Sequence, residues 1–508
     1  MSTERNKKIA KNTVFLTIRV LVVTLISLYT SRVILQELGV DDYGIYNIVG
    51  GFVALVNFLT FAISAAMQRF LRKEIEQHNN FRLQNVYSSC CVLAVLSILV
   101  TIIVLELIGT WFVLDKLNIP SSRIDVAFIV LQFSIFNVCC EIFKQIFHSL
   151  IVSYEKMNFY AYISIADAVL KLGVVYFLSI ISFDKLILFS ALQSFVAFGI
   201  LAISGLYCYW QFSNVRFSFK TNIKDLREIV KFSFWNSISS MSDVAYMHGS
   251  NILVNLFFGV TVNAAMGITN QVKSAVYTLT RNIQMAANPQ ILGYYSTGDY
   301  IEGRKLVFRI SRFSYYIMLL LGLPLFLNVD YILLIWLVKI PPYCPDLIRS
   351  LILFCMFDIF SGPLWTSMQG KGKIRNYQLI ISAILLLNLP LTYIAFSCNM
   401  PPYVLYLIQS FVVTILLFIR VWFAKKYCGF GFRDYFKSVI SKALIVTFIS
   451  TILPIIVAFT LKDVNFVNTL ISVVVSVVSV SFAVYFYGME YSERNMIDEK
   501  IKHFLRLK

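Results

Sequence analysis

Apolar runs of about twenty residues recur along the whole chain, and they constrain its fold more than any other feature. An α-helix rises 1.5 Å per residue, so roughly 20 apolar residues are enough to cross the ~30 Å hydrocarbon core of a bilayer. We therefore expect an all-α integral membrane protein with about 14 transmembrane helices. The predicted spans lie near 13–35, 44–66, 87–113, 125–150, 159–181, 186–209, 231–258, 265–290, 310–333, 347–368, 377–397, 402–424, 441–461 and 467–487.

The composition weighs against a soluble protein and against most enzymes. Only 14% of the 508 residues are charged, whereas soluble domains carry roughly 25%. The short polar stretches between the runs leave no room for a soluble catalytic domain. A net charge of +17 does not indicate nucleic acid, because the basic residues lie mainly in short loops and tails. We expect no cofactor and no metal site, since the nine cysteines show no metal-ligand spacing. Whether Cys344 and Cys398, both in predicted external loops, pair with each other is left open.

The basic residues also predict the topology. Thirty Lys and Arg residues fall in the tails and alternate loops of one side, or at their edges, against five on the other side. Loops rich in Lys and Arg remain on the cytoplasmic side of the membrane. A miscounted span would have moved every later loop to the opposite side, and the asymmetry would then have been lost. Both termini are therefore predicted to be cytoplasmic, with Met1 to Asn12 leading into a retained first helix.

A weak repeat divides the chain into two similar halves. Leu38-Gly39-Val40 after the first span matches Phe258-Gly259-Val260 after the seventh, at an offset of about 220 residues. At an offset of 217, Lys156–Tyr160 resembles Lys373–Tyr377. Repeats of this kind predict two pseudo-symmetric six-helix lobes, 1–210 and 211–424, related by an axis along the membrane normal. Residues 425–508 then supply two extra, smoothly apolar transmembrane helices and a cytoplasmic tail.

Four predicted spans, the first, second, seventh and eighth, are too polar to face lipid on all sides, and we expect them to line a central hydrophilic cavity. These four spans contribute four basic residues to the predicted cavity but only one acid, Asp243. The cavity therefore suits an anion such as pyrophosphate. Arg32 has a second interpretation: it lies near the end of a span, so its side chain could instead extend to the membrane surface. The candidate substrate-binding residues are Arg19, Arg32, Lys273 and Arg281, and the candidate polar lining residues are Asn57, Asn236, Asn270 and Gln271.

The acids within spans fall into two groups. Glu141 and Lys144, and likewise Asp167 and Lys171, are spaced to pair on one helix face, which favours a structural role over ion coupling. Asp243 and Asp358 have no such neighbour. They are candidates for the coupling ion, H⁺ or Na⁺, with an ion pair to another helix as the alternative.

Several segments resemble a known family. They are Ile9–Thr13, Leu28–Val33, Leu38–Asn47, Met67–Phe70 and the hairpin Gly370–Lys373. These residues resemble the Wzx-type O-antigen and polysaccharide-unit flippases of bacteria, in the multidrug/oligosaccharidyl-lipid/polysaccharide exporter (MOP) superfamily. The helix plan and the repeat extend the resemblance over most of the chain, without one diagnostic motif.

The resemblance implies two lobes that open alternately and carry undecaprenyl-pyrophosphate-linked oligosaccharide across the bacterial inner membrane, coupled to an ion gradient. By similarity to lipid II flippases, the last two spans would form a groove for the prenyl chain. The alternatives are a cation or drug extruder of the same superfamily, whose cavity would be acidic, and a membrane-embedded glycosyltransferase or polymerase. Such an enzyme needs a sizeable external loop with carboxylates, whereas the longest external loops here, 114–124 and 334–346, carry only Asp115 and Asp346.

Overall fold

The computed structural model describes residues 2–77, 80–154, 156–178, 180, 183–218, 223–371, 375–461, 465–491, 493–495 and 498–499. These residues form helices joined by short turns, and none of them lies in a strand. Two compact units account for the chain. The first comprises Met1–Gln271, Leu337–Cys344 and Leu385–Pro402, and the second comprises Val272–Trp336, Pro345–Ile384 and Tyr403–Lys508. The lobe boundaries predicted from the sequence remain a prediction.

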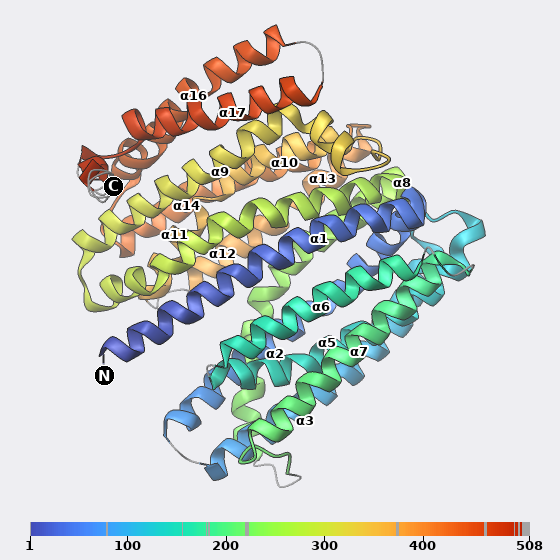
Figure 1. Ribbon diagram of the computed structural model, residues 1–508. Helices are drawn as coiled ribbons and strands as arrows, with labels where there is room; N and C mark the ends of the chain where they lie inside the picture. The colour runs from blue at the N-terminus through green and yellow to red at the C-terminus, as the bar shows by residue number, and fades with distance from the viewer. Residues whose placement is uncertain are drawn as a thin grey trace, which may run out of the picture. The chain divides into compact units, whose positions relative to one another are not determined.

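The first unit is built around α5, which packs against α2, α3 and α7, while α1 packs against α6 (Figure 1). Its helices are α1 (Ser2–Val53), α2 (Asn57–Glu76), α3 (Asn80–Val104), α4 (Thr110–Asp115), α5 (Ile124–Ser153), α6 (Met157–Phe177), α7 (Lys185–Gln211) and α13 (Asn388–Ser397). The long helix α8 (Ile223–Thr297) begins in this unit and continues into the second.

In the second unit, α17 packs against α16 and α9, and α11 packs against α14 and α9 (Figure 1). Its remaining helices are α9 (Tyr300–Trp336), α10 (Cys344–Asp358), α11 (Ser361–Lys371), α12 (Arg375–Leu386), α14 (Val404–Tyr427), α15 (Phe432–Tyr435), α16 (Ser441–Thr460) and α17 (Phe466–Ala483). The two extra helices predicted from the sequence correspond to α16 and α17.

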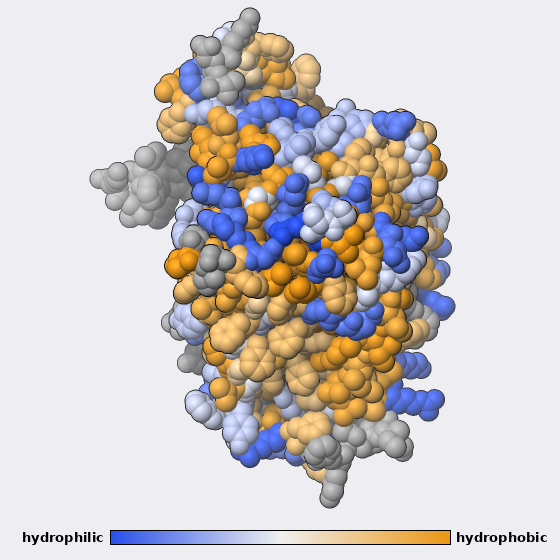
Figure 2. Space-filling view, turned by 90° about the vertical axis from the view of Figure 1, so that its right-hand side faces the viewer, coloured by the Kyte–Doolittle hydropathy of each residue, from blue (hydrophilic) through white to orange (hydrophobic). Residues whose placement is uncertain are grey.

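Twelve helical segments of the described residues are long and apolar enough to cross a membrane. Large hydrophobic side chains such as Leu107, Phe195 and Phe459 are more than two-thirds exposed, and Figure 2 shows broad hydrophobic areas on the surface. Acyl chains are the solvent that suits such a surface. The protein is thus an all-α, multi-pass membrane protein, as predicted, while the count of fourteen spans remains a prediction.

Two of the twelve segments, Arg19–Val56 and Val244–Met285, each cover two predicted spans. Each contains a glycine in the left-handed region: Gly39 has φ 77° and ψ 177°, and Gly259 has φ 74° and ψ −172°. L-residues rarely adopt this conformation, so a helix is interrupted there and glycine is the residue that fits. The same backbone corner therefore occurs twice, at the repeat offset that the sequence predicts.

The two corners pack against each other within the first unit. The Thr261 hydroxyl donates a hydrogen bond to Asp41 Oδ1 at 3.0 Å, and a methyl group at Gly44 would collide with the Val260 carbonyl oxygen. Asp41 and Thr261 occupy equivalent places in the repeat, and residues related by a two-fold axis touch where that axis passes. The predicted pseudo-symmetry axis of the repeat would therefore pass at this contact, on the face predicted to be external.

Candidate functional site

Arg19 and Arg32 are both half-buried on α1. They are 13 residues apart in one helix, which separates them by about 20 Å along its axis. That distance is too long for both to bind a single phosphate group.

Around Arg19, polar groups from three helices come together. Its Nη1 donates a hydrogen bond to Ser164 Oγ at 3.2 Å, and its guanidinium lies 4.8 Å from the centre of the Tyr160 ring. The Tyr160 ring also meets the His148 ring edge to face, with 5.3 Å between the ring centres. Arg19 Nε and His148 Nε2 are buried without a hydrogen-bond partner. We call Arg19, His148, Tyr160 and Ser164 the α1 cluster.

The acids on α5 and α6 form the ion pairs that their spacing predicts. Lys144 Nζ contacts Glu141 Oε1, and Lys171 Nζ lies 3.0 Å from Asp167 Oδ2. Because each acid has a base on its own helix, these pairs are largely self-neutralising. The α1 cluster therefore keeps the positive charge of Arg19.

On α8, Lys273, Tyr277 and Arg281 follow each other at intervals of four residues and so share one helix face. Lys273 Nζ lies 5.0 Å from the centre of the Phe354 ring on α10. The Arg281 guanidinium lies 4.8 Å from the centre of the Tyr277 ring. Aromatic faces stabilise cations without neutralising them, and neither cation forms an ion pair with a described residue.

The predicted tenth span is broken into two half-helices beside this face. Pro363 has no N–H to donate to the carbonyl four residues earlier, Ile359. The α10 helix ends at Asp358 and α11 begins at Ser361. Gln284 Nε2 from α8 donates to the freed Ile359 carbonyl at 3.0 Å. Interrupted membrane helices of this kind are common at transporter binding sites.

Asp358 lies at the end of the first half-helix, beside α8. Its Oδ2 accepts a hydrogen bond from the Tyr277 hydroxyl at 2.6 Å, and its Oδ1 accepts one from Ser361 Oγ at 3.3 Å. It also interacts electrostatically with Lys273. We use the name α8 cluster for the following residues: Lys273, Tyr277, Arg281, Gln284, Asp358 and Ser361.

The other predicted residues have simpler surroundings. Asn57 begins α2 and is half-buried, and so are Asn270 and Gln271 on α8. Asn236 and Asp243 lie outside the residues whose side chains the structure describes. All nine cysteines are free thiols, with Cys344 buried and Cys398 exposed. No group of three or more His, Cys, Asp or Glu side chains that could hold a metal ion occurs in the searched part of the chain.

Arg19 and Arg32 belong to the first unit, and Lys273 and Arg281 to the second. The single cavity that would unite them stays a prediction. Sequence reasoning missed the aromatic and hydroxyl partners of these cations, and it missed Arg420. This arginine on α14 is only 9% exposed, and its Nη1 donates to the Tyr377 hydroxyl at 2.5 Å. In the repeat, Tyr377 is the counterpart of Tyr160, so equivalent tyrosines each contact an arginine.

Solved structures with a similar fold are transporters of the MOP superfamily. Lipid II flippase MurJ, in an inward closed conformation, has 13% identity and a TM-score of 0.70, covering 92% of this chain and 97% of that one. A multidrug resistance MATE family transporter of the MOP superfamily, in an inward-facing conformation, has 12% identity and a TM-score of 0.67, covering 81% and 98%. A MOP superfamily transporter from Pyrococcus furiosus, described as having a binding pocket of reverse polarity, has 12% identity and a TM-score of 0.63, covering 82% and 96%. At these identities the likeness shows the fold.

No curated protein matches the chain at a significant level. The family model described as polysaccharide biosynthesis protein matches residues 9–297, which is more than half of the chain. That range includes both glycine corners, the α1 cluster and the α8 part of the α8 cluster. The chain therefore belongs to the polysaccharide biosynthesis protein family, and its fold is that of the MOP superfamily transporters.

Proposed function

We propose that this protein is a flippase, and not an enzyme, that moves undecaprenyl-pyrophosphate-linked oligosaccharide units across the bacterial inner membrane by alternating access. The family match supports a role in polysaccharide synthesis, and the fold supports transport. The units would be those of a surface polysaccharide such as the O-antigen of lipopolysaccharide. Both termini would lie in the cytoplasm, on the side rich in Lys and Arg.

The observation that carries the proposal is the state of three cations on helical segments that are apolar enough to span a membrane, of which Arg19 and Lys273 are half-buried and Arg281 is exposed. Arg19, Lys273 and Arg281 contact hydroxyl groups and aromatic faces, and none of them forms an ion pair with a described residue. A charge within the bilayer costs roughly 3 kcal/mol or more unless it is compensated. A pyrophosphate ligand compensates such charges, whereas an organic cation would be repelled by them.

Substrate binding is assigned to Arg19, Lys273 and Arg281, with Arg32 as a second, separate contact on α1. Pyrophosphate oxygens accept from guanidinium and ammonium groups. Sugar hydroxyls would pair with the amide and hydroxyl groups of Asn57, Asn236, Asn270 and Gln271. The prenyl chain remains in lipid, outside the polar clusters.

Ion coupling is assigned to Asp358, with Asp243 as the other candidate. Asp358 is the last residue of α10, and the C-terminal end of a helix favours a cation or a proton. Its two hydrogen-bond donors, Tyr277 and Ser361, link the carboxylate to the same α8 face that carries Lys273 and Arg281. Occupancy of Asp358 by H⁺ or Na⁺ would therefore alter the surroundings of the substrate cations.

The test of substrate class is transbilayer movement in proteoliposomes that contain the whole protein. A fluorescent undecaprenyl-pyrophosphate oligosaccharide and a fluorescent organic cation are compared under imposed H⁺ and Na⁺ gradients. The proposal predicts movement of the lipid-linked sugar and none of the cation. Movement of the cation alone would replace the flippase with a drug extruder, and lengthening of the sugar chain would indicate a polymerase.

A further inference from the structure

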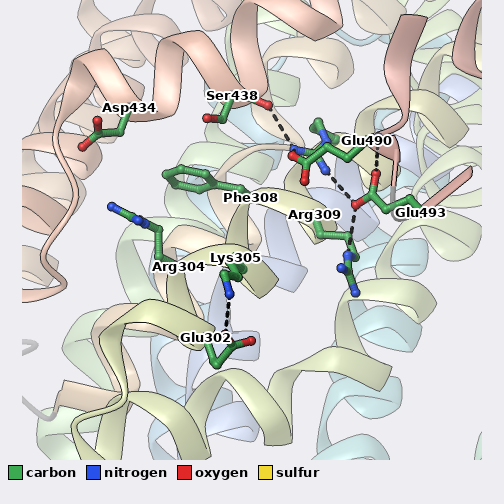
Figure 3. A pocket seen from close by; sticks show the side chains of 10 residues that line it. Glu302, Arg304, Lys305, Phe308, Arg309, Asp434, Ser438, Glu490 and Glu493 are labelled. Carbon is green, nitrogen blue, oxygen red and sulfur yellow. Dashed lines mark hydrogen bonds and ion pairs between the residues drawn. The ribbon is translucent and has the colours of Figure 1, made fainter. Parts of the chain in front are cut away.

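A polar pocket of about 520 Å³ lies in the second unit, away from the α8 cluster. Its walls come from the first turns of α9, from α15 and the turn after it, and from the segment that follows α17 (Figure 3). These segments lie at the beginning of Tyr300–Trp336, at the beginning of Phe432–Thr460 and just after Phe466–Gly488. The pocket is therefore at a membrane surface, on the side predicted to be cytoplasmic.

A buried ion-pair network closes one end of the pocket. Arg312 is 1% exposed and donates to Glu493 and Glu490, both at 2.7 Å, and to the Ser438 carbonyl at 3.2 Å. Glu493 also accepts from Arg309 Nε at 3.0 Å. This network, drawn with dashed lines in Figure 3, attaches the segment after α17 to α9.

The remaining acids of the wall also accept hydrogen bonds. Glu302 pairs with Lys305 at 2.6 Å, and Asp434 accepts the Gly431 backbone N–H at 3.2 Å. Each of the four carboxylates that line the pocket thus already has a donor. Three of them, Glu302, Glu490 and Glu493, are paired with basic side chains, whereas Asp434 is bonded only by a backbone amide.

The basic side chains of the wall, in contrast, have donors to spare. Arg304 lines the pocket and forms no hydrogen bond or ion pair with a described residue. Arg309 uses only its Nε, which leaves both terminal amino groups without a hydrogen bond in the described part of the chain. Lys305 is held only by an exposed pair, and such pairs are weak. A wall with surplus charged donors fits a ligand that brings oxygen acceptors.

Aromatic side chains on the same segments are exposed. Phe432 is 40% exposed and Phe436 is 42% exposed on the α15 side. Tyr487 is 51% exposed at the end of the α17 segment. Exposed aromatic residues at the end of membrane helices are typical of the headgroup level of a bilayer. The segments that line the pocket are therefore expected to lie at the headgroup level of the bilayer.

We propose that the pocket binds the phosphate headgroup of an anionic phospholipid of the adjacent leaflet, with Arg304 and Arg309 donating to the phosphate. Pockets that bind small ligands usually have volumes of about 300–1,000 Å³. The pocket here, at about 520 Å³, is of a size that suits a phospholipid headgroup. This lipid is distinct from the transported molecule. It would bridge α9, α15 and the segment after α17, and so support the position of the α16–α17 pair.

The test measures lipid retention by native mass spectrometry of the whole detergent-solubilised protein titrated with phosphatidylglycerol or phosphatidylcholine. Phosphatidylglycerol is expected to bind roughly tenfold more tightly than phosphatidylcholine, and Arg304→Gln to remove roughly that advantage. Lys437→Gln is the matched control, because Lys437 is an exposed cation beside the pocket that does not line it. Arg304→Lys, which keeps the charge, should retain most of the preference and shows that loss in Arg304→Gln is not misfolding.

Two results would overturn the proposal. One is equal retention of the two lipids, or an unchanged preference in Arg304→Gln. The other is competition by inorganic phosphate at the same concentration as phosphatidylglycerol, which would make the pocket a site for soluble phosphate. The measurement needs no transported substrate, so it stands apart from the flippase assay.

Discussion

Aromatic rings and a hydroxyl group are the close contacts of Arg19, Lys273 and Arg281, whereas Lys144 and Lys171 are paired with carboxylates. Spacing within one helix correctly predicted the pairs Glu141–Lys144 and Asp167–Lys171, because both members lie on the same face. It did not predict that Ser164 would contact Arg19, because that contact joins α6 to α1 and depends on helix packing. Single residues that carry charge are thus readable from sequence, whereas their partners on other helices are not.

Arg312 is expected to be the most sensitive charged residue of the second unit. Arg312→Ala leaves Glu493, itself 5% exposed, with Arg309 as its remaining basic partner, and removing one partner of a buried ion pair costs about 3–5 kcal/mol. Lys305→Ala removes a charge from the same helix but from an exposed pair, for which about 0–1 kcal/mol is usual. Unfolding of the two variants in detergent, compared with the native protein, checks this difference. Equal stability of both variants would contradict the role of the network.

Glu490 makes the same network sensitive to acid. Burial alone raises the pKa of Glu490, but the charges of Arg312 and Lys442 and the hydrogen bonds they donate outweigh it and lower the pKa below its usual value of 4.5. A lowered carboxylate pKa contributes stability above that usual value, and the contribution is lost as the pH falls through the folded-state pKa. Glu490→Gln should therefore be less stable than the native protein at pH 7, with the difference shrinking below pH 4.5. A difference in stability that is constant from pH 7 to pH 3 would contradict this account.

At the scale of elements, the sequence predicted the tenth span correctly but not its interruption. The signal was present in Pro363, within the predicted span 347–368. Proline in a membrane helix has several outcomes, from a bend to a full break. The outcome here depends on Gln284 of α8, which satisfies the Ile359 carbonyl. A residue on another helix decided the local structure, and no local pattern contains that information.

The break is expected to serve transport at the expense of stability. In Pro363→Ala, the new N–H can bond to the Ile359 carbonyl and continue the helix, which is worth up to about 3 kcal/mol. Gln284 then loses its acceptor, and the Asp358–Ser361 contact at the junction is disturbed. We expect a higher unfolding temperature and transport slowed by roughly tenfold. Pro454→Ala on α16, outside the α8 cluster, is the control, and equally fast transport in Pro363→Ala would show that the break has no role.

At the scale of the whole molecule, the repeat was the most informative pattern in the sequence. The offset of 220 residues matched Gly39 with Gly259, and the two glycines adopt nearly identical backbone angles. That these corners touch each other through Asp41 and Thr261 was not predictable. An offset reveals which residues are equivalent, but it does not contain the distance between them. Arg123 further holds the first corner, through Asp42, to Asp184 at the beginning of α7.

In the proposed alternating access, each predicted lobe carries one corner, so we expect the two corners to separate when the protein opens to the predicted external side. Asp41→Cys combined with Thr261→Cys, in a chain whose native cysteines are replaced, should be joined by a short bis-thiosulfonate cross-linker, which attaches to each thiol through a disulfide bond. Cross-linking is expected to stop transport, and reduction to restore it. The two single variants treated with the same reagent are the controls. Undiminished transport by the cross-linked protein would rule out corner separation as a step.

The central claim, that unpaired cations in the membrane bind the pyrophosphate, is tested most directly by transbilayer movement of the lipid-linked oligosaccharide in Arg19→Gln, Lys273→Gln and Arg281→Gln. Arg216→Gln is the matched control, because Arg216 lies 5.0 Å from the Tyr209 ring in a similar cation–π contact but outside the membrane spans. We expect each of the three variants to slow movement by roughly tenfold or more, as loss of a charged hydrogen bond implies, while Arg216→Gln matches the native protein. Unchanged movement in all three variants would contradict the claim.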